Sequence, residues 1–95
     1  MPHTFKRDMT ITHADFFRLL PKALGCENYS VGDNRIELTE GNVSVQLALS
    51  AETSWRIGAL SLPKTEVNIR IEGCDKDEAQ RRINQFDRTY QKGGG

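Results

Sequence analysis

Apolar and polar residues alternate along the middle of the chain, which is the pattern of strands with one buried face. The clearest run is 43–49, with an apolar residue at every second position. The stretch 67–71 repeats this pattern, and shorter stretches at 29–31 and 36–38 agree with it. The stretch 55–62 begins in the same way and then changes phase. Period-two alternation predicts half-buried strands, and the short turns between the runs favour an antiparallel meander.

Two segments that flank the strands have the periodicity of amphipathic helices. In the first, Thr12 is the expected N-cap and Gly25 the expected C-cap, and Pro21 is expected to kink or divide the helix. In the second, Asp75 and Glu78 form a D-x-x-E start. The side chains expected to face the sheet are Ala14, Phe17, Leu20 and Leu24, with Phe16 and Ala23 beside them, and Ala79, Ile83, Phe86 and Tyr90 in the second helix.

These elements predict an α+β fold. We expect a two-layer sandwich in which an antiparallel meander of four or five strands carries an N-terminal and a C-terminal helix on one face. Both helices must cover the apolar sheet face, because no other segment can. The segment 5–11 is expected to be a fifth strand or an extended N-terminal arm. We predict one domain over 1–92 and a flexible glycine tail at 93–95.

The composition narrows the classes of partner. The chain has 95 residues and equal numbers of basic and acidic side chains, 13 of each, which argues against bulk attraction to nucleic acid or anionic lipid. It has no run of about 20 apolar residues that could cross a membrane and no recognisable export signal. We therefore expect a cytoplasmic protein with Cys26 and Cys74 as reduced thiols. The spacing of its Cys and His residues gives no metal site.

The motifs of common active sites are missing from the sequence. It contains neither a phosphate-binding glycine loop nor a G-x-S-x-G elbow, so we favour a non-enzymatic protein without a cofactor. Cys74 precedes the second helix, where the helix dipole favours a reactive thiolate; the alternative is a small buried residue. Arg81, Arg88 and Lys92 form a basic ridge, which we interpret as a solvated, salt-bridged face rather than a nucleic-acid site.

Two sets of apolar residues are candidate binding sites. Phe17, Leu20, Trp55, Phe86 and Tyr90 would line a cavity for a small apolar ligand between helices and sheet, unless they pack as solid core. Ala48, Leu60 and Leu62 would form an apolar patch on the open face of the sheet. In this arrangement Trp55 faces inward and the two leucines outward. The alternative is a β-bulge near Gly58 or Ala59 that buries both leucines.

The sequence thus supports one leading hypothesis and two alternatives. The leading hypothesis is a small interaction or assembly module that associates with itself, as a homodimer, or with another protein, through the open sheet face. The alternatives are a carrier of a small apolar ligand and a thiol-based redox protein centred on Cys74.

Overall fold

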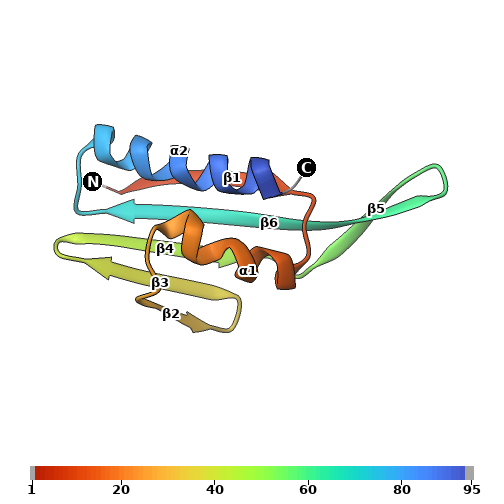
Figure 1. The fold of residues 1–95 in the computed structure, drawn as a ribbon, viewed down its shortest axis with the longest axis horizontal. Helices are drawn as coiled ribbons and strands as arrows, with labels where there is room; N and C mark the ends of the chain where they lie inside the picture. Colours follow the sequence, from red (N-terminus) through yellow and green to blue (C-terminus); the bar gives the residue numbers. More distant parts are fainter. Residues whose placement is uncertain (1, 94–95) are drawn as a thin grey trace.

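A computed structural model describes residues 2–93 of the chain, with side chains described over 2–90. It contains six strands and two helices in an α+β arrangement (Figure 1). The elements are β1 (His3–Met9), α1 (His13–Leu24), β2 (Tyr29–Gly32), β3 (Arg35–Glu40), β4 (Val43–Leu49), β5 (Thr53–Ile57), β6 (Leu60–Glu72) and α2 (Lys76–Gly93). Gly93 therefore ends a helix, and positions 94–95 of the expected glycine tail lie outside the described residues.

The sheet is antiparallel throughout, with strand order β1-β6-β4-β3-β2. Strands β2, β3, β4 and β6 form the expected meander. The N-terminal segment adds a fifth strand, β1, on the far side of β6, with Phe5 opposite Ile69. Strand β5 pairs with β6 alone, outside this sheet. The antiparallel meander predicted from the sequence is confirmed, including the N-terminal strand that the sequence indicated only weakly.

Both helices lie on one face of the sheet (Figure 1). Their buried side chains and the inward residues of the strands form one apolar cluster. The fully buried members of the sheet include Ile36, Leu47 and Ile71, on three different strands. Burying this face, at roughly 25 cal/mol per Å² of apolar surface, is the main stabilising contribution to the domain.

The sequence predicted the buried face of α2 correctly. Ala79, Ile83, Phe86 and Tyr90 are all buried. The predicted helix start also forms, since the Asp75 carboxylate accepts a hydrogen bond from the Glu78 N–H at 2.9 Å.

The buried face of α1 is rotated from the predicted one. Phe16, Leu20 and Ala23 are buried, whereas Ala14 is exposed. The apolar residues of this helix form two overlapping stripes, one that includes Ala14 and one that includes Phe16. The second stripe is buried because it contacts α2, where the Phe16 ring stacks on Tyr90 with centroids 5.0 Å apart. The predicted N-cap at Thr12 and left-handed C-cap at Gly25 are both present.

The opposite face of the sheet is polar. The outward positions of β6 include Asn68 and Arg70, and Gln46 and Glu37 face outward from β4 and β3. The apolar residue of the central strands on this face is Ala48, which pairs with Arg35 and Asn68. The apolar patch expected on this face is therefore not found.

Candidate functional site

The most distinctive feature of the structure is a two-stranded ribbon that projects beyond the sheet (Figure 1). It consists of β5 and the first five residues of β6, residues 53–64, and we call it the arm. The longest dimension of the molecule, 47 Å, runs along the arm, against 25 and 21 Å in the other directions. The helices do not cover the arm, so neither of its faces reaches the core.

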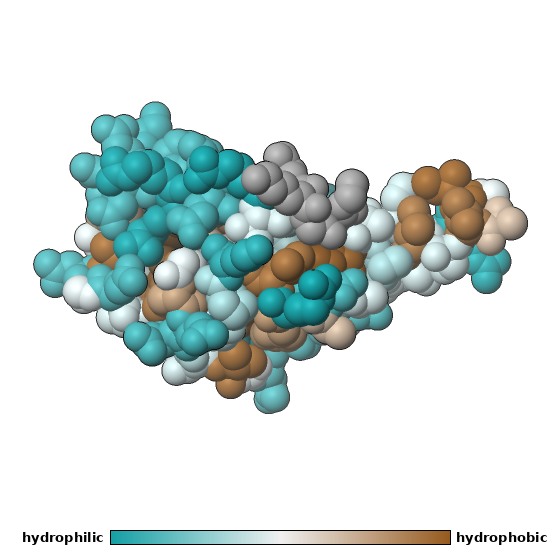
Figure 2. All heavy atoms as spheres, in the orientation of Figure 1, coloured by the Kyte–Doolittle hydropathy of each residue, from teal (hydrophilic) through white to brown (hydrophobic). Residues whose placement is uncertain are grey.

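One face of the arm is apolar. Trp55 pairs with Leu62, and Ile57 pairs with Leu60. Residues directly opposite each other in an antiparallel pair share a face, so these four side chains form a single surface, the arm face. Trp55, Ile57 and Leu60 are 42%, 53% and 65% exposed. In the space-filling view the arm stands out as an apolar projection at the right of the molecule (Figure 2).

A two-residue turn produces the arm. Gly58 and Ala59 connect the paired residues Ile57 and Leu60. Gly58 has φ +61°, as required at the first central position of a type II′ hairpin turn. The prediction that 55–62 is one strand, with Trp55 on the opposite side from the leucines, is wrong. The chain reverses at Gly58, which puts Trp55 and Leu62 on the same face without a β-bulge.

The base of the arm is fixed to the body by hydrogen bonds. The Ser50 N–H donates to the Glu66 carbonyl at 2.8 Å, and the Glu66 N–H donates to Ser50 Oγ at 2.9 Å. His13 Nε2 lies 2.9 Å from the Ser50 carbonyl oxygen. The buried Thr65 hydroxyl donates to the Ile11 carbonyl at 3.0 Å. These hydrogen bonds fix the direction in which the arm leaves the sheet.

The three residues predicted for partner binding do not form one patch. Leu60 and Leu62 lie on the arm, Leu62 half-buried. Ala48 lies opposite Asn68, six residues along β6 from Leu62 and so about 20 Å away at 3.3 Å per residue. Ala48 instead lines a depression of about 340 Å³ on the open face. A role for these residues in partner binding stays a prediction.

Four of the five residues predicted to line a ligand cavity pack against one another in the core. Leu20, Phe86 and Tyr90 are buried, and Phe17 packs against the same cluster. The Phe86 and Tyr90 rings are 4.8 Å apart, which leaves no space between them. Trp55 is on the arm, away from this group. The arrangement corresponds to the alternative reading of these aromatic residues as solid core.

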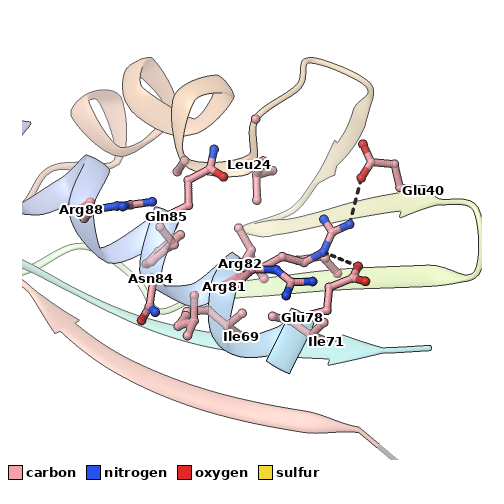
Figure 3. Close-up of a pocket in the computed structure, with 16 residues that line it drawn as sticks. Leu24, Glu40, Ile69, Ile71, Glu78, Arg81, Arg82, Asn84, Gln85 and Arg88 are labelled. Atoms are coloured by element: carbon pink, nitrogen blue, oxygen red, sulfur yellow. Dashed lines mark hydrogen bonds and ion pairs between the residues drawn. The ribbon is translucent and has the colours of Figure 1, made fainter. Parts of the chain in front are cut away.

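A cleft of about 700 Å³ lies elsewhere, between the end of α1, the first three turns of α2 and the sheet (Figure 3). Of the five predicted ligand residues, only Phe86 lines it. Arg82 extends across the cleft and donates to Glu40 at 3.0 Å and to Glu78 at 3.1 Å. Burial would lower the pKa of the Arg82 guanidinium, but these hydrogen bonds raise it above its ordinary value. The charge is thus already paired within the protein, and in the described part of the chain every buried side-chain N or O atom has a partner.

The remaining candidates are dispersed. Cys74 is half-buried between β6 and α2 and packs against the core, and its backbone carbonyl lies 3.3 Å from His3 Nε2. Cys26 and Cys74 are both free thiols.

Arg81 and Arg88 lie at the rim of the cleft. Over residues 2–90, no three His, Cys, Asp or Glu side chains converge as metal ligands would, and neither helix is long and apolar enough to span a membrane.

Comparisons with protein-family models, with curated proteins and with solved structures found no match to this chain. Among the described residues, the arm face is the group of large apolar side chains that packing in the core does not account for.

Proposed function

We propose that this protein is a non-enzymatic assembly module that associates with a second copy of itself through the arm face. The observation that carries this proposal is the exposure of Trp55, Ile57 and Leu60 on one face of a projecting hairpin. An isolated two-stranded hairpin is marginally stable in water. A hairpin that exposes three large apolar side chains becomes more stable when a partner covers them.

A second copy is the occupant that the surface of this chain favours. Among the described residues, the exposed large apolar side chains are the three on the arm and Val31 on β2. An apolar partner surface in a homodimer must therefore come mainly from the other arm. The pairs Trp55–Leu62 and Ile57–Leu60 offer the same flat apolar ribbon in each copy, so two arms can bring these side chains together around a two-fold axis.

The size of the arm face sets the strength of the association. Its three exposed side chains leave on the order of 300 Å² of apolar surface uncovered. Even complete coverage of both arm faces would bury only roughly 600 Å² of it, which is below the ~1,200 Å² of stable complexes. We expect a weak dimer in rapid exchange, so its population should depend strongly on protein concentration.

The two free thiols favour a cytoplasmic setting for this module. Cys26 and Cys74 are unpaired, and unpaired thiols are usual in reducing compartments.

The experiment measures mass against concentration. Sedimentation equilibrium from micromolar to millimolar protein is compared for the wild type, Ile57→Ser and Leu60→Ser. Val31→Ser is the matched control, since Val31 is 55% exposed and Ile57 53%. Trp55 is the one tryptophan of the chain, so its fluorescence reports on the arm directly.

We expect the average mass of the wild type to rise toward that of a dimer, and its tryptophan emission to shift to shorter wavelength as Trp55 is covered. Both changes should persist in Val31→Ser and disappear in Ile57→Ser and Leu60→Ser. A wild type that remains monomeric at millimolar concentration, with unshifted emission, would overturn the proposal.

A further inference from the structure

The open edges of the sheet differ in how well they are protected against strand addition. β2 has four residues and ends in Gly32. β1 carries three consecutive charged residues, Lys6, Arg7 and Asp8. Short edge strands and charged side chains are the usual means of preventing edge-to-edge pairing. The two edges of the arm have to be considered separately.

The β6 edge of the arm is blocked by a proline. Residues that flank a two-residue turn exchange both backbone hydrogen bonds, and every second pair points its N–H and C=O outward. Ile57–Leu60 is the flanking pair, so Arg56–Ser61 and Ser54–Pro63 point outward. The Glu66 hydrogen bonds to Ser50 fit the same alternation. At Pro63 the outward N–H is missing, so an added strand would find no donor there.

The β5 edge of the arm has no such protection. Its sequence is Thr-Ser-Trp-Arg-Ile, with three residue types that favour strands, no proline and one charge. Ser54 and Arg56 both direct a backbone N–H and C=O outward from this edge. It keeps its donors and lacks a charge cluster, and with five residues it is longer than the uncharged edge strand β2, which has four.

We propose that the outer edge of β5 pairs antiparallel with β5 of a second copy, about a two-fold axis at Trp55. This inference rests on the self-association proposed above and specifies a side-by-side geometry, in which the two arm faces form one continuous surface and meet at Trp55. Ser54 would exchange two backbone hydrogen bonds with the partner's Arg56, and symmetry repeats them, giving four. The two arms would form one four-stranded ribbon in the order β6-β5-β5-β6.

Charge and length select this register. Shifting the pairing toward the turn places Arg56 opposite the partner's Arg56, and like charges directly opposite each other are unfavourable. Shifting it the other way drives each turn past the base of the partner's arm, where Ser50 and Glu52 bind His13. The register centred on Trp55 pairs all five residues of β5.

This register brings Trp55 against the partner's Trp55. In the new ladder these two form a pair without mutual hydrogen bonds, in which side chains approach most closely. Two indoles so placed couple electronically and give an exciton couplet in the far-ultraviolet circular dichroism. The edge geometry requires this contact, whereas face-to-face packing of the arms does not, so a dimer without a couplet would contradict the edge geometry.

The test uses proline at the outward-pointing positions on the two edges. Arg56→Pro removes the β5 donor, and Ser61→Pro, directly opposite, removes the corresponding donor on β6. Neither substitution removes a hydrogen bond of the hairpin, and the thermal transition of each variant checks that the body is folded. Dimer dissociation constants are measured by sedimentation, with circular dichroism on the same samples.

We expect Arg56→Pro to weaken the dimer at least tenfold and abolish the couplet, and Ser61→Pro to retain both. If both proline variants dimerise like the wild type while Ile57→Ser does not, the edge geometry is wrong but self-association through the arm face stands. If the wild type does not dimerise at millimolar concentration, both proposals fail.

Discussion

The Tyr90 hydroxyl donates a 2.8 Å hydrogen bond to the backbone carbonyl of Phe16, while the rings of the two residues lie nearly parallel, 7° apart. Tyr90 is near the end of α2 and Phe16 is in the first turns of α1. The pair therefore joins segments 74 residues apart in the sequence and fixes one helix against the other. Both residues are buried, so water cannot replace the hydrogen bond.

Tyr90→Phe should lower the free energy of unfolding by about 1 kcal/mol. The stacked ring remains, but the Phe16 carbonyl loses its buried donor. Chemical denaturation at neutral pH measures the loss. Equal stability of variant and wild type would contradict the role assigned to the hydroxyl.

The same residue should make stability depend on alkaline pH. Burial raises the pKa of the Tyr90 hydroxyl above its ordinary value, with a smaller contribution from Tyr29. The unfolded chain therefore loses this proton first, near pH 10. The contribution is fully present below that pH and is lost as pH rises toward the folded pKa, at up to ~1.4 kcal/mol per pH unit. Denaturation at about pH 10 and pH 11 should show a steeper decline for the wild type than for Tyr90→Phe.

Gly73→Ala should destabilise the protein by at least ~2 kcal/mol. Gly73 has φ +83°, a region costly for residues with a side chain, and a Cβ there would overlap the backbone carbonyl of Asn42. Gly32→Ala is the control, because Gly32 has open space around the added atom and no left-handed φ. Thermal denaturation of both variants should separate them; similar transitions would show that the β6–α2 connection tolerates a side chain.

Arg7→Lys should cost about 1 kcal/mol. The Arg7 guanidinium makes two hydrogen bonds to the Asp87 carboxylate, at 2.9 and 3.0 Å, and so ties β1 to α2. A lysine cannot form this two-point contact. Arg18→Lys is the comparison, since the Arg18–Asp15 pair is longer, at 3.6 Å, and largely exposed. Urea unfolding should place Arg18→Lys within about 0.5 kcal/mol of the wild type. If Arg7→Lys loses no more unfolding free energy than Arg18→Lys, the two-point contact with Asp87 does not stabilise the protein beyond an exposed ion pair.

The arm should contribute little to the stability of the monomer. At micromolar concentration, Leu60→Ser should change the unfolding free energy by less than about 0.5 kcal/mol, because Leu60 is 65% exposed. Leu47→Ala, at a fully buried position of β4, should cost about 3 kcal/mol. Comparable losses in the two variants would mean that the arm packs on the body in solution.

Periodicity in the sequence predicted the elements whose environment is uniform. Val45 and Leu47 on β4, and Ile83 and Phe86 on α2, face a single core, so their spacing indicates which side is buried. The N-terminal strand was harder to predict, because β1 alternates half-buried and exposed residues and includes Arg7 on the inward side.

The arm was not predicted, because its apolar residues do not serve the core. Alternation at Trp55 and Ile57 has the same appearance whether the face packs on helices or projects into solvent. The available signal was the pair Gly58–Ala59 between two strand-forming runs, which is compatible with a II′ turn. Treating this glycine as a turn would have placed Trp55 and Leu62 on one face.

Strand β6 runs without interruption from the tip of the arm to the centre of the sheet, where it lies between β1 and β4. A pull on the arm along its length would therefore load two rows of backbone hydrogen bonds at once, in shear. Separation would require these bonds to break together rather than one after another, as they do when a strand is peeled from an edge. Tension along the long axis would thus be resisted by both rows of hydrogen bonds together.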